Sequence, residues 1–370
     1  MLGRSLIVFT IASSMGLAYG SAQVSATEAE SAVACDVPAE GKLTMADLPP
    51  GSSATECGAI GRVVTYGSIG VTVPNPGTSV TVHALLDDGS ARGFTMVVDS
   101  NGSVSYREAG TPPDDNPFTD GADTPDVLPN PAVTGADLTT ESDATDADEP
   151  GGAIPGEALV QEVDVAAVPS ACSDGAYNMM DQKEYGTYNW YLGDGGMPGA
   201  ISRSDAYYAF HDAITNITQS SNNCGLADQV SASASYKGYT SYEADISSGS
   251  ECTSRDGKST WDAGNLISGH IAVTCSWNSV DWGDPDDLRE ADVRYNTTDK
   301  NFTDYPTSSC YEKYDVRAVG THEAGHVFGM DHVGSGHNNL TMYGGSSPFK
   351  CSISGRTLGK GDVLGLRSRY

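Results

Sequence analysis

Basic residues are scarce in this sequence. The chain of 370 residues has 20 Lys and Arg against 49 Asp and Glu, which gives a formal net charge of −29. Nucleic acid and anionic membrane surfaces attract proteins through Lys and Arg, so this charge excludes both as general partners.

No Lys or Arg occurs at all between Glu108 and Gln182, where Asp, Glu, Pro, Gly and Thr dominate. Clustered carboxylates repel one another and few apolar residues are available to bury, so residues 108–167 are predicted to form an acidic, disordered linker. Calcium binding is the alternative, because hard cations prefer carboxylate oxygen. Asp120-Gly121-Ala122-Asp123 is too short to match an EF-hand loop, which favours the linker.

Apolar runs long enough to cross a membrane are also missing. The longest, Leu6–Ala18, follows Arg4 and precedes small residues at 20–22. It is shorter than the roughly 20 residues that a membrane span needs. This pattern is typical of an export signal, so residues 1–22 are predicted to be a signal peptide and the protein to be secreted.

The pair C-x-x-C does not occur, which argues against cysteine-bound zinc and against a redox dithiol. The eight cysteines form an even set, and in an exported chain such a set indicates disulfides. We expect Cys35 to pair with Cys57. The pairing of the other six cysteines stays open at this stage.

What the sequence does have is the run His322–His332, which reads H-E-A-G-H-V-F-G-M-D-H. Residues four apart share one face of a helix, so His322 and His326 can bind one metal ion. Glu323 is the next residue along and is too close in sequence to reach the same ion comfortably. It is predicted to act as the general base that takes a proton from water.

Gly329 follows the second histidine by three residues, where the helix must stop. Glycine tolerates the left-handed conformation that reverses the chain and would bring His332 round as a third ligand. A zinc ion held in this way keeps a fourth position open for water. The other interpretation is a polar helix with hydrogen-bonded core histidines, but the fixed offsets of Gly329 and His332 favour the zinc site.

At these residues the sequence resembles the metzincin zinc peptidases, whose pattern is H-E-x-x-H-x-x-G-x-x-H followed by a methionine turn. Thr341-Met342-Tyr343-Gly344 resembles that turn, and the resemblance implies that Met342 packs beneath the metal histidines. The Met-Tyr pair, the ending 358–370 and the segment 188–214 look most like the matrixin branch. Two features depart from it. Val333 replaces the usual Ser or Thr, and only His211 and His270 lie upstream within this domain to hold a structural zinc.

The resemblance implies an α+β fold for residues 168–370, with a twisted mixed sheet, a zinc-binding helix and a small C-terminal subdomain. It also implies that an edge strand of this sheet pairs with extended substrate, a form of β-augmentation. Candidates for that edge are 291–297 and 270–277. Helices are expected at 204–220 and at 316–328, the second with Asp315 as its N-cap. A disulfide between Cys310 and Cys351 would fasten the segments on either side of the ligands.

Residues 27–107 have strand composition, with turns at Asp87-Asp88-Gly89 and Ser100-Asn101-Gly102. They are predicted to form a small, separate β-rich domain that serves as a propeptide. A binding module kept on the mature enzyme is the alternative. Cys35 lies in Ala34-Cys35-Asp36-Val37-Pro38, which lacks the Arg and Gly of the matrixin cysteine switch, so a plain disulfide is preferred.

These features together predict a secreted, monomeric zinc endopeptidase that is made as a proenzyme and acts on proteins or peptides. It would use one catalytic Zn²⁺, with Ca²⁺ left open as a second ion. The other class of function is a non-catalytic extracellular binding protein on a metzincin scaffold. The presence of Glu323 favours the enzyme, because loss of the base is the simplest way to abolish hydrolysis.

Overall fold

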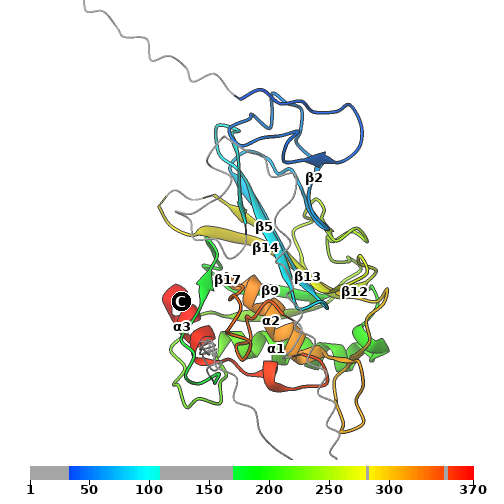
Figure 1. Cartoon of the computed structure of the whole chain (residues 1–370), viewed down its shortest axis with the longest axis vertical. Coiled ribbons are helices and arrows are strands. Elements are labelled where there is room, and N and C mark those ends of the chain that lie inside the picture. The colour runs from blue at the N-terminus through cyan, green and yellow to red at the C-terminus, as the bar shows by residue number, and fades with distance from the viewer. Residues whose placement is uncertain (1–32, 109–169, 281–282, 346–348) are drawn as a thin grey trace, which may run out of the picture. The chain divides into compact units, whose positions relative to one another are not determined.

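The computed structural model describes residues 33–108, 170–280, 283–345 and 349–370. The predicted signal peptide and nearly all of the predicted linker lie outside these residues. The described part of the chain is a mixed α+β structure with one large mixed sheet and few helices (Figure 1). None of the helices found in these ranges combines the length and the apolar character needed to cross a bilayer.

The large sheet has the strand order β10-β9-β12-β14-β13-β4-β5-β6, and β8 also pairs with β14. The pairs β10–β9, β9–β12, β12–β14 and β8–β14 are parallel, whereas β13 is antiparallel to both of its neighbours, β14 and β4. The strands are β4 (Thr78–Leu86), β5 (Ala91–Val98), β6 (Val104–Glu108), β8 (Gln182–Lys183), β9 (Tyr188–Leu192), β10 (Ala234–Tyr239), β12 (Ser259–Gly264), β13 (His270–Ser279) and β14 (Asp286–Asn296).

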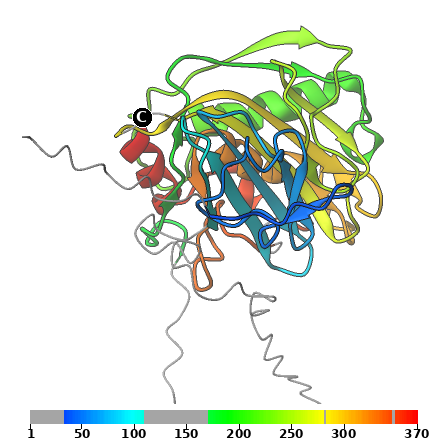
Figure 2. The same ribbon diagram turned by 90° about the horizontal axis from the view of Figure 1, so that it is seen from above.

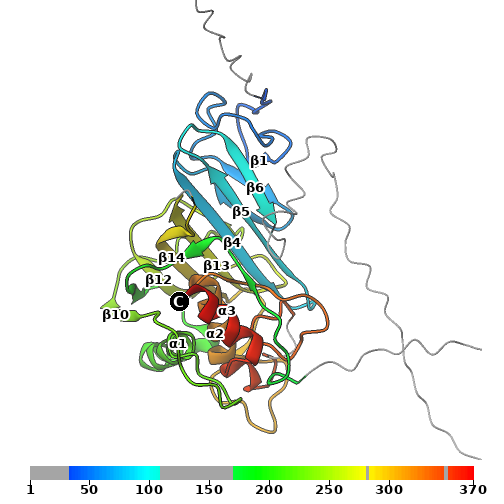
Figure 3. The ribbon, with the colours of Figure 1, turned by 90° about the vertical axis from the view of Figure 1, so that its left-hand side faces the viewer.

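Two helices, α1 (Arg203–Thr218) and α2 (Val316–Val327), lie on one side of this sheet (Figure 3). Each begins at a capping side chain that satisfies an unpaired backbone N–H. Ser202 accepts from the N–H of Asp205, and Asp315 accepts from the N–H of Ala318, as predicted for the second helix. The short helix α3 (Lys360–Arg369) ends the chain, and the 3₁₀ turns are η2 (Pro198–Ala200) and η3 (Ser354–Arg356).

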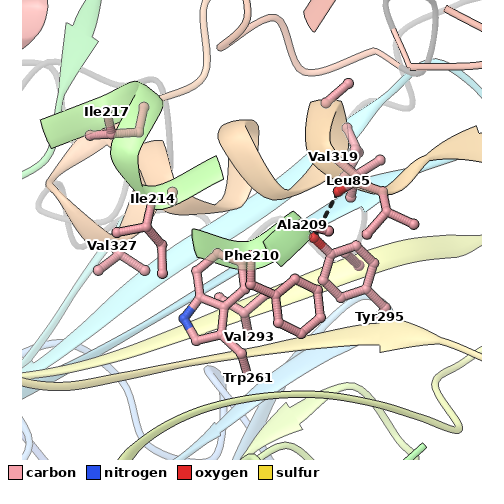
Figure 4. Close-up of a cluster of buried hydrophobic side chains, with 14 of the residues drawn as sticks. Leu85, Ala209, Phe210, Ile214, Ile217, Trp261, Val293, Tyr295, Val319 and Val327 are labelled. Carbon is pink, nitrogen blue, oxygen red and sulfur yellow. Dashed lines mark hydrogen bonds between the residues drawn. The ribbon is translucent and has the colours of Figure 1, made fainter. Parts of the chain in front are cut away.

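The core between the helices and the sheet is rich in aromatic rings (Figure 4). Phe210 of α1 packs against Trp261 and Tyr295 of the sheet, with ring centroids 5.3 and 5.2 Å apart. The hydroxyl of Tyr295 donates to the carbonyl of Val316 at 3.0 Å, which satisfies its polar end. Burial of each such ring stabilises the fold by about 1.5–3 kcal/mol. This core fixes α2 against the sheet.

The N-terminal strands continue the same sheet, contrary to the separate domain predicted for residues 27–107. Strands β4 to β6 form the expected meander, but β4 pairs with β13 from Thr78↔Ser279 to Leu86↔His270 (Figure 2). Residues 33–370 accordingly form one compact unit. A second sheet, in the order β1-β2-β3-β11, joins the same two parts of the chain. Its strands are β1 (Leu43–Thr44), β2 (Val63–Tyr66), β3 (Ile69–Thr72) and β11 (Glu251–Cys252).

The physical reason for this joining is burial on both faces of β4. Val80, Val82 and Ala84 point into a second apolar core. The neighbouring strand β13 contributes Val273 and Trp277 to that same core. Pairing also satisfies the backbone groups along two edges that would otherwise be exposed. The local sequence predicts each strand but not its distant partner.

All eight cysteines form disulfides, and the expected pairs Cys35–Cys57 and Cys310–Cys351 are confirmed. The remaining bonds are Cys172–Cys224 and Cys252–Cys275. One bond lies within residues 33–108 and three lie within 170–370. No disulfide therefore connects these two parts of the chain.

Candidate metal centre

The ligand helix α2 places His322 and His326 on one face, and their side chains are 0% and 1% exposed. The helix ends at Val327 and the chain reverses at Gly329, whose φ is +82°. A Cβ at that position would lie 2.6 Å from the carbonyl oxygen of Gln182, so only glycine fits there. After the reversal, β17 (Met330–Asp331) pairs with β7 (Asn178–Met179) and leads into the third histidine.

The three histidines converge as the sequence predicts. The Nε2 atoms of His322 and His332 are 3.1 Å apart, and that of His326 is 3.2 Å from the first and 3.0 Å from the second. Nitrogens bound tetrahedrally to one zinc at about 2.0–2.1 Å are about 3.3 Å apart. The triangle of nitrogens therefore fits a single zinc ion after small adjustments.

Hydrogen bonds on the far side of two rings determine which nitrogen faces the centre. Nδ1 of His322 lies 2.7 Å from the carbonyl oxygen of Thr341, and Nδ1 of His326 lies 2.9 Å from that of Met330. Because a carbonyl can only accept, both Nδ1 atoms carry the proton, and each neutral ring turns the lone pair of Nε2 inward. Lone pairs about 3 Å apart repel one another unless a cation lies between them. This arrangement is typical of a metal site with its supporting shell.

Burial keeps these rings neutral. It lowers the pKa of His322 to about 4 and lowers the pKa values of His326 and His332 well below the usual range for histidine. Neutral imidazole is the form that binds metal. The electrostatic environment thus favours a divalent cation over protonated rings.

Glu323 directly follows the ligand candidate His322 on α2 and is 0% exposed. Its Oε2 accepts a hydrogen bond from the hydroxyl of Thr274 on β13 at 2.5 Å, while its Oε1 is buried and has no hydrogen-bond partner among the described residues. Burial raises the pKa of this carboxyl to about 8. A buried carboxyl oxygen that no protein group satisfies is free to bind a proton or a water molecule in a reaction.

The segment 341–344, predicted to be a methionine turn, packs against helix α2. Met342 is 1% exposed, and its sulfur is so close to Gly325 of α2 that a Cβ on this glycine would collide with it. Asp362 accepts from the backbone N–H groups of Thr341 and Met342 at 2.9 and 3.2 Å. Asp362 lies in the first turn of α3. It also holds the turn whose Thr341 carbonyl orients His322.

Two further residues beside the histidines were missed by the sequence. His83 of β4 is 2% exposed, and its ring stacks on that of His326 with centroids 4.1 Å apart and planes 3° from parallel. Its Nε2 is 3.3 Å from Oδ1 of Asp331, an oxygen that also accepts from the N–H of His332 at 2.7 Å. A histidine within a buried apolar strand was the available signal for His83.

The other groups with possible ligand atoms lie elsewhere. Nδ1 of His337 lies 2.8 Å from Oδ2 of Asp174. Within the described ranges, His211 and His270 belong to no common group of potential metal ligands. Asp245, Glu290 and Asp292 do form a compact carboxylate cluster, in which the buried Asp292 accepts from two backbone N–H groups.

Comparison with protein-family models gives no match to this chain, and comparison with curated proteins gives none of significance. The functional assignment therefore depends on the geometry of the site and on the sequence motif.

Proposed function

We propose that the protein is a secreted zinc endopeptidase of metzincin type that is made as a proenzyme. The observation that carries this proposal is the convergence of three Nε2 lone pairs, together with the unsatisfied Oε1 of Glu323, the residue that follows the first of these histidines. Three neutral imidazoles with an adjacent carboxyl are the donor set of a hydrolytic zinc site. Four disulfides agree with an oxidising, extracellular location.

When bound, zinc acidifies water and polarises the carbonyl of the scissile peptide bond. Glu323 takes the proton from the attacking water on Oε1 and delivers it to the nitrogen of the departing amine. The hydroxyl of Thr274 holds Oε2, so the carboxyl keeps one orientation through both transfers. Burial raises the pKa of this carboxyl above its usual range, so it is a stronger base than an exposed glutamate.

The three histidines bind the ion and are themselves held in place. Thr341 and Met330 orient two of the rings through their carbonyls. The amide of Asn178 donates to the carbonyl of His332 at 2.8 Å and fixes the third ligand's backbone. Such supporting contacts are typical of functional metal sites, and their loss costs about 10–100-fold in affinity or activity.

The alternative, a non-catalytic binding protein on the same scaffold, is less well supported because Glu323 is present and has a free oxygen. The test is hydrolysis of a quenched casein substrate by purified protein whose linker has been cut at an inserted specific-protease sequence, and from which the N-terminal part has been removed. Zinc content is measured in parallel. We expect activity that disappears with phenanthroline, returns with zinc and is lost in Glu323→Gln.

The matched control is Glu312→Gln, an exposed carboxylate in the same part of the chain, which should retain full activity. Stoichiometric zinc without hydrolysis of any protein substrate would support the non-catalytic scaffold instead.

A further inference from the structure

Strand β13 runs past the candidate site and its outer edge is already paired. Among the strands of residues 170–370 that form the large sheet, it is the last one before β4. Thr274, near its middle, holds Glu323, so this stretch of the strand lies directly beside the proposed chemistry. A strand edge in such a position is suited to bind the extended backbone of a peptide. Here the edge is occupied by β4 along its whole length.

The register of β4 places a histidine over the metal ligands. His83 is opposite Thr274, and cross-strand partners point to the same face of a sheet. Its ring therefore extends toward α2, where it stacks on His326 at 4.1 Å. His83 thus lies opposite Thr274, the residue that holds Glu323. From this position its ring covers His326, one of the proposed zinc ligands.

The turn that follows β4 extends this cover to the far side of the site. Asp87 donates its N–H to the carbonyl of Gly269 at 2.9 Å and pairs with Lys300 at 2.7 Å. Beyond the turn, the Cβ of Ala91 would be 2.7 Å from a Cβ on Gly344, just after the methionine turn. Strand and turn together span from β13 to Gly344, and the site residues beneath are at most 9% exposed.

We propose that residues 33–108 are a built-in inhibitor whose strand β4 occupies the place of the substrate backbone along β13. This proposal rests on the peptidase function proposed above and identifies the segment that must leave before a peptide can enter. No hydrolysis of β4 itself is required for the block. Pairing with β13 and the ring of His83 keep other chains out.

The covalent structure allows this segment to be released intact. The only disulfide in residues 33–108 joins Cys35 to Cys57, so the linker is the sole covalent connection to residues 170–370. A cut in the linker therefore leaves the inhibitor bound by non-covalent contacts alone, namely strand pairing, the shared apolar core and side-chain contacts such as Lys300–Asp87. Activity should appear when it dissociates, not at the moment of cutting.

The test locks β4 onto β13 with a new disulfide in the full chain. Thr78 and Ser279 are partly exposed partners in the register and are changed to cysteine as a pair, in a chain with a specific-protease sequence inserted in the linker. The matched control puts cysteines at Val97 and Ser105, which are partners within residues 33–108. Only the first bond joins the inhibitor to the remainder of the protein.

After the linker is cut and the protein diluted, the control should hydrolyse a quenched peptide at least about 100-fold faster than the chain with the Thr78–Ser279 bond. Mild reduction of the exposed bond should restore the rate, and the unsubstituted cut chain treated with the same reductant corrects for effects on native disulfides. Equal and measurable rates of hydrolysis in the two oxidised variants would overturn the proposal.

A second measurement tests the inhibitor proposal independently of the peptidase proposal. Zinc should leave the chain with the Thr78–Ser279 bond more slowly than it leaves the control when a chelator is added, because β4 covers the ligands. If zinc leaves the locked chain more slowly but no preparation hydrolyses the substrate, the proposed peptidase function is wrong, whereas β4 still covers the metal ligands. Equal rates of zinc loss would overturn the cover even if hydrolysis is observed.

Discussion

The two parts of the large sheet have different surroundings and contribute differently to the site. Strands β9, β12, β13 and β14 are covered by helices α1 and α2, and this part of the chain holds the three histidines on a helix and a tight turn. Strands β4 to β6 pack on a second core, and their part supplies a strand and a hairpin turn beside the site. One part holds the three proposed metal ligands, and the other lies over them.

This difference teaches that proximity to a metal is not the same as binding it. His326 and His83 are stacked rings, yet only His326 turns a lone pair toward two other histidines. The distinction can be tested by changing matched residues in the two parts of the chain.

The largest effect is expected from His326→Ala, which removes one of three ligands. Zinc binding should fall by at least about 100-fold, whereas His83→Ala should lower it by less than about 10-fold, because His83 acts only through its contact with the ligands. Competition with a fluorescent zinc chelator measures both affinities. If zinc affinity fell as much in His83→Ala as in His326→Ala, His83 would also have to be a zinc ligand.

A smaller but still large effect is expected from Glu323→Gln, which keeps the shape of the side chain and removes the base. Hydrolysis by protein freed of residues 33–108 should fall by about 10²–10⁴-fold while zinc remains stoichiometric. This result would show that residues 170–370 supply the catalytic base as well as the metal ligands. Loss of zinc together with activity would instead make Glu323 a structural support.

Glycines with the same φ in the two parts allow a third comparison. Gly329 and Gly89 both have φ of +82°, but a Cβ at Gly329 meets the carbonyl oxygen of Gln182 at 2.6 Å, and a Cβ at Gly89 meets nothing within 4 Å. Gly329→Ala should cost about 3 kcal/mol of unfolding free energy and Gly89→Ala about 1 kcal/mol. Urea unfolding of the zinc-loaded protein measures both. If the two substitutions reduced the unfolding free energy equally, the backbone around Gly329 would have to shift to accommodate the added Cβ.

The smallest effect concerns the carboxylate cluster on β14. Burial raises the pKa of Glu290 to about 7, above its unfolded value near 4.5. The unfolded chain therefore ionises first, and stability falls as pH rises from about 4.5 through about 7. Glu290→Gln should reduce this fall by about 1 kcal/mol between pH 5 and pH 8. The exposed Glu56→Gln serves as the control, and an unchanged pH dependence in Glu290→Gln would contradict the assignment.

The convergence of the three histidines could be predicted from the sequence because its geometry is local. The spacing of His322 and His326 determines a shared helix face, and Gly329 marks the reversal that the positive φ confirms. The N-cap Asp315 and the disulfides Cys35–Cys57 and Cys310–Cys351 were also predicted from nearby residues.

The position of β4 could not be predicted in the same way. Its partner β13 is nearly 200 residues away in the sequence. No short sequence pattern within a strand identifies which distant strand it will pair with. One signal was present, because eight of the nine residues of β4 are buried, which is typical of an interior strand with both faces covered. The role of His83 follows from that position and not from its local sequence.

The order of the disulfides has a consequence for the biogenesis of the chain. Each cysteine bonds to the next cysteine along the sequence, from Cys35–Cys57 through to Cys310–Cys351. If the chain is secreted with its N-terminus first, as proposed above, the two cysteines of each bond would emerge one after the other. Oxidation in that order would give this pairing without disulfide reshuffling.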